Sequence, residues 1–217
     1  MFKVARYWRP VGFVLLISGL VLLMLPFVRY AFVFGAEGLG LGELRDSYLF
    51  RDGGGLSNPA IFGHMLCGAV VTLLVPVQLI PWVRRLLPWW HRWAGRIITG
   101  LGLMTGAAGL LYILQRGSVG GWPMDLGFGI YGLCLIVSCV QTLRFARAGQ
   151  MDRHRRWALR TFWLAIGSWL YRFHYGLWYL ATDGAASNAN FSGAFDLVQN
   201  FAFYLPYLLG LELYLRR

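Results

Sequence analysis

The chain has 217 residues, of which 58% are hydrophobic and 13% charged, with a mean hydropathy of +0.54 and a formal net charge of +11. A soluble domain carries about 25% charged residues, so this composition excludes an ordinary soluble protein. The basic residues do not indicate nucleic-acid binding, because they stand at the ends of long apolar runs and not on a polar folded face. We therefore expect a membrane protein with no nucleic-acid partner.

Six segments reach the roughly 17–25 apolar residues that a helix needs to cross a bilayer. They are expected near residues 11–33, 59–82, 94–114, 124–144, 157–181 and 195–215. The first segment is long and no small-residue cleavage site follows it, so we interpret it as a retained helix and not as a signal peptide. The breaks between the segments are too short to hold a second domain. The sequence thus predicts an all-α membrane protein, a six-transmembrane-helix bundle forming one domain over residues 1–217.

The basic residues predict the orientation of this bundle. If the N-terminus is cytoplasmic, fifteen of the twenty Lys and Arg residues lie on or near the cytoplasmic side: Lys3, Arg6, Arg9, Arg84, Arg85, Arg92, Arg96, Arg144, Arg147, Arg153, Arg155, Arg156, Arg160, Arg216 and Arg217. Cytoplasmic loops of membrane proteins carry such an excess. We expect both termini in the cytoplasm, an external loop over 34–58, and a multi-pass protein of the bacterial inner membrane.

Glycines recur in the third and fourth expected helices at spacings that allow close helix approach: Gly102, Gly106, Gly109, Gly127, Gly129 and Gly132. Small residues commonly line the interfaces of membrane helix bundles. We interpret these glycines as packing residues.

Two histidines lie well inside the expected helices near their external ends. His64 is roughly 8 Å below the end of the second helix and His174 roughly 10 Å below that of the fifth, at a rise of about 1.5 Å per residue. Histidines at equal depth on neighbouring helices can ligate haem b, so His64 and His174 are candidate axial ligands. The alternative is that each imidazole hydrogen-bonds a neighbouring helix, His64 to a hydroxyl and His174 to a tyrosine such as Tyr171 or Tyr131.

A second pair of histidines stands at the cytoplasmic mouths of the third and fifth helices. His91, Arg92 and Arg96 form one group, and His154, Arg155 and Arg156 form the other, in a weak internal repeat. We consider an anion site for lipid phosphate or haem propionates, and as the alternative simple anchoring of the helices by Arg and Trp at the headgroups. On one continuous helix His154 and His174 would point about 160° apart. This favours a separate role for the inner pair over a second haem.

Two further polar residues lie at membrane depth. Gln78 follows His64 by fourteen residues, which would put both on nearly the same helix face. Arg172 faces away from His174 and needs a partner. For Arg172 we expect a structural ion pair with Asp125, Asp183 or Asp196.

The polar residues, taken in order, resemble a known family. His64, Gln78 and Arg85 precede His91-Arg92-x-x-Gly95-Arg96, and His154-Arg155-Arg156-Trp157 precedes Arg172. Over roughly residues 60–175 this run is similar to the bacterial membrane family named domain of unknown function 2306. The resemblance implies a helical membrane bundle and the same polar residues, and it implies no activity.

Two functions remain open from the sequence. The first is membrane electron transfer linked to haem b or quinone through His64 and His174. The second is a non-catalytic membrane subunit or scaffold that binds lipid or a larger membrane complex. The motifs of membrane metalloproteases, P-loop proteins and serine hydrolases are missing from the sequence, so whether the protein is an enzyme stays undetermined.

The predicted orientation can be tested with single cysteines, introduced at Ser47 and at Ala148 in a background without the native cysteines. A membrane-impermeant maleimide added to intact cells should label Ser47→Cys and leave Ala148→Cys unlabelled until the membrane is opened. Labelling of Ala148→Cys in intact cells would contradict the orientation.

Overall fold

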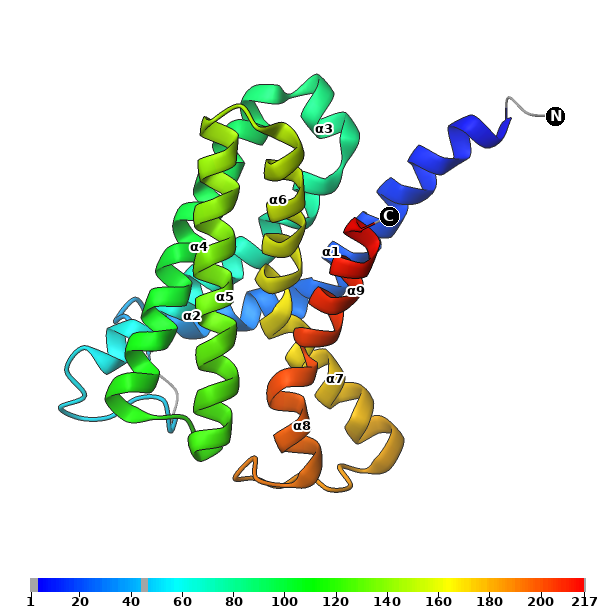
Figure 1. The fold of residues 1–217 in the computed structure, drawn as a ribbon. Helices are drawn as coiled ribbons and strands as arrows, with labels where there is room; N and C mark the ends of the chain where they lie inside the picture. The colour runs from blue at the N-terminus through cyan, green and yellow to red at the C-terminus, as the bar shows by residue number, and fades with distance from the viewer. Residues whose placement is uncertain (1–3, 44–46, 217) are drawn as a thin grey trace.

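The computed structural model describes residues 4–43 and 47–216, and for residues 4–10 only the course of the helix. This part of the chain folds into helices joined by short turns (Figure 1). The elements are α1 (Val4–Gly38), α2 (Ser57–Leu74), the 3₁₀ helix η1 (Pro76–Leu79), α3 (Pro81–Leu86), α4 (Pro88–Arg116), α5 (Gly121–Arg147), α6 (Met151–Ala165), α7 (Gly167–Thr182), α8 (Ala194–Ala202) and α9 (Leu205–Leu215). The prediction of an all-α fold is confirmed.

Four helical stretches are long and apolar enough to cross a membrane in the described part of the chain. They are Val11–Gly38, Ser57–Leu79, Pro88–Arg116 and Gly121–Arg147. They correspond to the first four segments expected from the sequence. Each stretch is at least as long as the roughly 20 residues that a bilayer core requires.

The last two expected segments are interrupted helices. Residues 157–181 break at Ile166, between α6 and α7, and residues 195–215 break at Phe203 and Tyr204, between α8 and α9. Pro206 stands in the first turn of α9, where its missing N–H costs no helical hydrogen bond. Neither half is long enough to span a bilayer alone.

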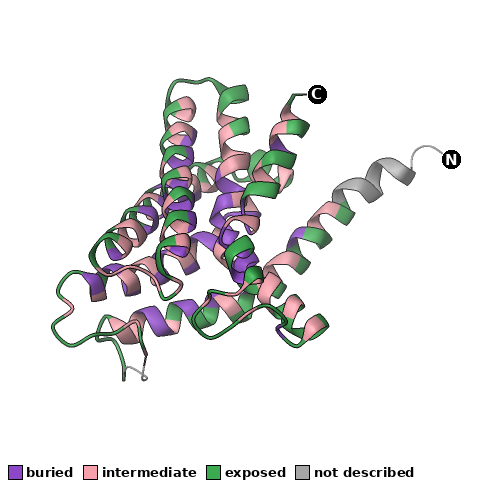
Figure 2. Ribbon diagram, turned by 60° about the horizontal axis from the view of Figure 1, so that its bottom comes forward, coloured by how far each residue is buried: buried purple, intermediate pink, exposed green. Residues whose placement is uncertain are grey.

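The helices pack in a sequence of neighbours, α1 on α2, α2 on α4, α4 on α5 and α5 on α6. Helix α3 and the turn between α5 and α6 lie at one end of the molecule, and the turns after α4 and α7 lie at the other (Figure 1). The first half of α1 extends away from the bundle. Buried residues follow the faces where the helices meet, and the outward faces carry exposed leucines such as Leu15, Leu114 and Leu180 (Figure 2). Such a surface suits contact with lipid tails.

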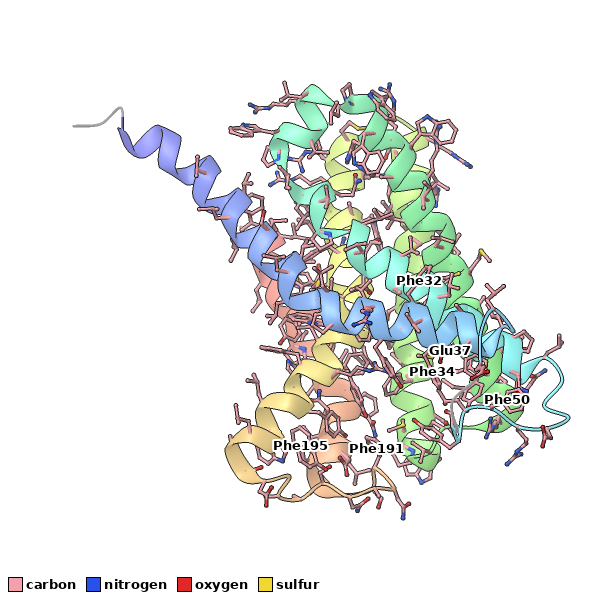
Figure 3. The ribbon with its side chains drawn as sticks, turned by 180° about the vertical axis from the view of Figure 1, so that it is seen from behind. Phe32, Phe34, Glu37, Phe50, Phe191 and Phe195 are labelled. Atoms are coloured by element: carbon pink, nitrogen blue, oxygen red, sulfur yellow. The ribbon has the colours of Figure 1, made fainter. Side chains whose placement is uncertain are left out.

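One carboxylate organises the turn between α7 and α8. Asp196 is fully buried and accepts hydrogen bonds from Tyr175 Oη and Ser187 Oγ, both at 2.7 Å, and from the backbone N–H groups of Gly193 and Asn188 at 2.9 and 3.1 Å. A buried charge needs this many donors. The rings of Phe191 and Phe195 pack beside the network, between the two helices, in Figure 3.

Most of the glycines interpreted as packing residues lie at close helix contacts. A Cβ atom on Gly127 would be 2.5 Å from the backbone oxygen of Asn200 in α8, and one on Gly102 would be 2.7 Å from Cys139 Sγ. Gly129 differs, because a Cβ added there would have no atom within 4 Å.

These contacts predict different effects for two substitutions in α5. Gly127→Ala should lower the free energy of unfolding by about 1–3 kcal/mol, because the backbone of α8 would have to move. Gly129→Ala, the matched control, should leave it unchanged or raise it slightly, because alanine favours the helix. Thermal unfolding of the purified protein in detergent measures both, and equal melting temperatures for the two variants would contradict the α5–α8 contact.

Candidate functional site

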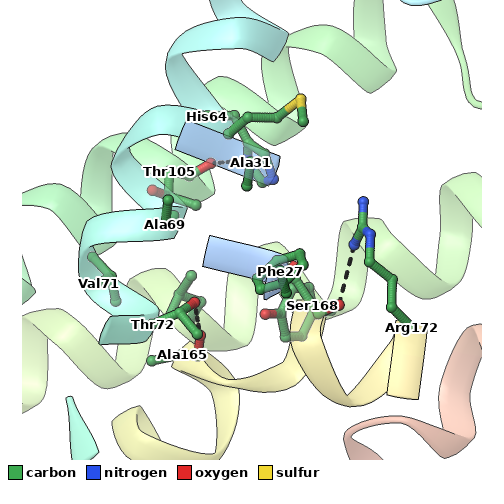
Figure 4. Close-up of a pocket in the computed structure, with 14 residues that line it drawn as sticks. Phe27, Ala31, His64, Ala69, Val71, Thr72, Thr105, Ala165, Ser168 and Arg172 are labelled. Carbon is green, nitrogen blue, oxygen red and sulfur yellow. Dashed lines mark hydrogen bonds between the residues drawn. The ribbon is translucent and has the colours of Figure 1, made fainter. Parts of the chain in front are cut away.

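A small, mainly apolar cavity with several polar groups on its wall lies inside the bundle, between α1, α2, α4, α5, α6 and α7 (Figure 4). Its volume is about 40 Å³, which has room for water molecules and not for a larger ligand unless the walls move. The polar residues on its wall are His64, Thr72, Thr105, Tyr131, Ser168 and Arg172. Polar groups at membrane depth are costly, so this grouping marks a candidate site.

The first wall residue, His64, has a fixed orientation. Its Nδ1 atom lies 2.9 Å from the carbonyl oxygen of Thr105 in α4. A carbonyl only accepts hydrogen bonds, so Nδ1 carries the proton and Nε2 of the neutral ring is left as an acceptor. Gly109 makes this approach possible, since a Cβ there would be 3.0 Å from His64 Nδ1. The partner of His64 is a backbone carbonyl and not the hydroxyl considered from the sequence.

Arg172 lies at the rim of the same cavity. Its Nη1 donates to the carbonyl of Ser168 at 3.1 Å, and its guanidinium stacks 5.0 Å from the ring of Phe27 on α1. Phe27 is near the middle of a candidate membrane span, which puts Arg172 at membrane depth.

The ion pair expected for Arg172 is missing from the described residues. The carboxylate of Asp125 accepts from the backbone N–H of Ser118 at 2.6 Å, and that of Asp196 is engaged in the turn before α8. Arg172 is therefore a cation without an acidic partner in this part of the chain. A guanidinium carries five N–H donors, and only one of its contacts uses them.

The floor of the cavity is the break between α6 and α7. Two carbonyls near this break accept side-chain hydrogen bonds from other helices: Leu164 from Tyr131 Oη at 2.5 Å, and Ala165 from Thr72 Oγ1 at 3.1 Å. A Cβ on Gly167 would be 2.8 Å from the Tyr131 ring, so glycine lets the ring fit against the break. These bonds satisfy backbone groups that lipid could not.

His174 points to a different part of the molecule. Gln199 Nε2 donates to its Nδ1 at 3.0 Å, which leaves its Nε2 to donate to Tyr207 Oη at 2.7 Å. Gln199 is in α8 and Tyr207 in α9, so His174 joins the last three helices. The hydrogen-bonded alternative thus describes both outer histidines, although the tyrosine is Tyr207 and not Tyr171 or Tyr131. Among the described residues, no hydrogen bond links His64 to His174.

The residues of the inner mouths are only partly brought together. His91 and His154 are close enough to interact electrostatically, as are His91 and Arg92. Arg96 instead stacks on Trp93 at 4.9 Å, and Arg155 and Arg156 are exposed. His154 lies inside α6, so the chain is already helical there, and the break at Ile166 separates it from His174.

Two glutamines lie near the inner histidines, at the end of the bundle that carries α3. Regular α-helical spacing does not extend from His64 to Gln78, because α2 ends at Leu74 and the chain continues as a 3₁₀ helix. Gln141 in α5 was not singled out from the sequence, yet its Oε1 is buried without a hydrogen-bond partner. The sequence contains a pattern that could have identified Gln141, because each of the two glutamines precedes an inner histidine by thirteen residues.

Fold and cavity together define a multi-pass helical membrane protein with polar groups grouped in its interior. A family model described as "Predicted membrane protein (DUF2306)" matches residues 61–209, and the chain belongs to this family. The predicted family is therefore confirmed. No curated protein and no solved structure matches the chain.

The contacts of His174 predict a structural role that can be measured. Tyr207→Phe and Gln199→Leu should each lower the free energy of unfolding by about 1–3 kcal/mol, because a ring nitrogen of His174 loses its partner away from water. Tyr214→Phe, an exposed tyrosine of the same helix as Tyr207, is the control and should have no effect. Unchanged melting temperatures for the first two variants would contradict this role.

Proposed function

We propose that the walls of this cavity move apart to admit the headgroup of a membrane quinone, and that the protein takes part in quinone-linked electron transfer. One observation carries the proposal: at membrane depth, a guanidinium without an acidic partner among the described residues shares a cavity with a histidine whose free nitrogen is an acceptor.

The two side chains supply complementary hydrogen-bonding groups. A quinone headgroup presents carbonyl oxygens, and Arg172 has N–H donors to spare for one of them. A reduced quinone presents hydroxyl groups, and Nε2 of His64 can accept a hydrogen bond or a proton from one. Phe27 adds an aromatic ring beside Arg172. A polar ligand would also lower the free-energy cost of the unpaired cation in the membrane.

The haem form of the same hypothesis fits these residues less well. Bis-histidine ligation needs one free nitrogen on each ring, and both ring nitrogens of His174 already have partners in Gln199 and Tyr207. Tyr207 would have to move before His174 could bind iron. We therefore assign no step to haem b, and the visible absorption spectrum of the purified protein tests whether haem is bound.

The membrane topology belongs to the same proposal. We place α6 with α7 and α8 with α9 as the fifth and sixth membrane segments, each interrupted near its middle. The end of the bundle that carries α3 and the α5–α6 turn holds Arg84, Arg85, Arg144, Arg147 and Arg153, which supports a cytoplasmic location of that end and of both termini. We assign this membrane as the bacterial inner membrane, and the same asymmetry supports that assignment.

The non-catalytic subunit is the second candidate, and one observation favours it. The first half of α1 extends beyond the bundle with exposed Leu15 and Leu16, and it could contact another membrane protein as well as lipid. Under this alternative the cavity would hold no redox ligand.

The quinone proposal predicts that a short-chain ubiquinone or menaquinone analogue binds the purified protein and quenches its tryptophan fluorescence. Arg172→Gln should weaken this binding at least about ten-fold, as expected for the loss of a charge-assisted hydrogen bond. Arg29→Gln is the matched control: an exposed arginine of a candidate span that does not line the cavity. Its affinity should equal that of the unmodified protein.

Solvent extraction of protein purified from native membranes completes the test. A co-purified quinone that is lost in Arg172→Gln and kept in Arg29→Gln would support the proposal. A Soret band abolished by His64→Ala or His174→Ala would instead restore the haem form. A colourless protein with neither bound nor titrated quinone would leave the scaffold alternative.

A further inference from the structure

A second group of polar side chains is buried at the end of the bundle that carries α3. Four buried polar atoms there have no hydrogen-bond partner: Oε1 and Nε2 of Gln78, Nδ1 of His91, and Oε1 of Gln141. Buried polar atoms in proteins are nearly always paired, so each unpaired atom calls for an explanation. Three side chains with this property at one end of the bundle indicate a missing polar partner.

Hydrogen bonds and electrostatic contacts connect these residues across five elements. Arg84 of α3 donates to the backbone carbonyl of Gln78 at 3.4 Å and interacts electrostatically with His91 of α4. His91 interacts in the same way with His154 of α6. His154 Nδ1 in turn donates to the carbonyl of Thr142, the neighbour of Gln141 in α5, at 3.0 Å. As in His64, this bond leaves Nε2 of His154 free to act as an acceptor.

The two halves of the group repeat in the sequence. Gln78 and Gln141 each stand thirteen residues before a histidine, and each histidine is followed by a Trp-Ala-x-Arg run. The structure repeats as well, because Arg96 stacks on Trp93 at 4.9 Å and Arg160 on Trp157 at 4.5 Å. Two copies of one helical unit thus each supply a glutamine amide and an imidazole to the same end of the bundle.

The charge around the group is strongly positive. Residues 81–96 and 141–156 contain Arg84, Arg85, Arg92, Arg96, Arg144, Arg147, Arg153, Arg155 and Arg156 and a single acid, Asp152. An anion is therefore the partner that the local electrostatics favour. Phosphate oxygens accept hydrogen bonds from the Gln78 amide, the His91 imidazole and the Arg84 guanidinium. A P–OH group or a headgroup hydroxyl can donate to the remaining acceptors, Oε1 of Gln141 and Nε2 of His154.

We propose that Gln78, His91, Gln141 and His154, together with Arg84, form a binding site for a phosphate group. It is distinct from the quinone cavity, and it stands or falls independently of it. The phosphate belongs either to the headgroup of an anionic lipid or to a soluble phosphate ester that enters from the aqueous side. Arg96, Arg155 and Arg156 contribute charge at the entrance and no direct contact.

The test measures binding to purified full-length protein by tryptophan fluorescence, which Trp89 and Trp90 beside His91 make sensitive to this end. Two probes are titrated separately: inorganic phosphate, and short-chain phosphatidylglycerol with short-chain phosphatidylcholine as the zwitterionic control. Binding of inorganic phosphate assigns a soluble source, and binding of phosphatidylglycerol alone assigns a lipid source. Either result supports the site, and failure of both probes to bind overturns it.

Variants locate the binding. Gln141→Leu and His91→Phe should each weaken the probe at least about ten-fold, while Arg96→Gln, the control at the entrance, should change affinity less than about two-fold. Both site variants replace an unpaired polar group by an apolar one, so they should melt at or above the temperature of the unmodified protein. Unchanged affinity in the two site variants, or an equal loss in Arg96→Gln, would overturn the proposal.

Discussion

Every backbone N–H and C=O group at membrane depth needs a partner within the protein, and the break between α6 and α7 shows how strongly this requirement shapes the bundle. Where the helix stops at Ile166, the carbonyls of Leu164 and Ala165 accept hydrogen bonds from Tyr131 and Thr72. Those donors belong to α5 and α2, so the break fixes the positions of two other helices. It also turns α7 away from α6 and puts Ser168 and Arg172 on the cavity wall.

The same requirement separates the two polar regions of the molecule. In the cavity, His64 and Arg172 use backbone carbonyls as partners and retain unused hydrogen-bonding capacity. Near the break between α8 and α9, both ring nitrogens of His174 are hydrogen-bonded, to Gln199 and to Tyr207, and these bonds hold the helices together. Two histidines that the sequence predicts at similar depth thus have different chemistry, because one ring keeps a free nitrogen and the other does not.

Hydropathy alone was enough to predict the helical class and the first four membrane segments, since long apolar runs leave the backbone no other arrangement in lipid. The interruptions in the last two segments could not be predicted. A single glycine such as Gly167 is ordinary in a membrane helix, and only the structure shows the Tyr131 ring packed against it at the break. The depth of His64 and His174 along their helices predicted them as a pair. Depth says little about the direction in which a side chain points around its helix, or about which helices are neighbours.

Gln141 was missed in the sequence because its significance lies in its spacing from His154. That spacing is noticed only when it is compared with the equal spacing between Gln78 and His91.

The ion pair between Arg160 and Glu212 has a consequence for biogenesis. Arg160 of α6 donates two hydrogen bonds to the Glu212 carboxylate of α9, at 2.7 and 2.9 Å, and the two side chains form a salt bridge. A carboxylate entering the membrane on its own is costly, and the presence of a nearby guanidinium reduces that cost. Since α6 precedes α9 in the chain, Arg160 is synthesised before Glu212. Under the proposed topology, in which α8 and α9 form one membrane segment, insertion of α9 is therefore coupled to the prior placement of α6, and a truncated or misinserted α6 would leave Glu212 without its partner.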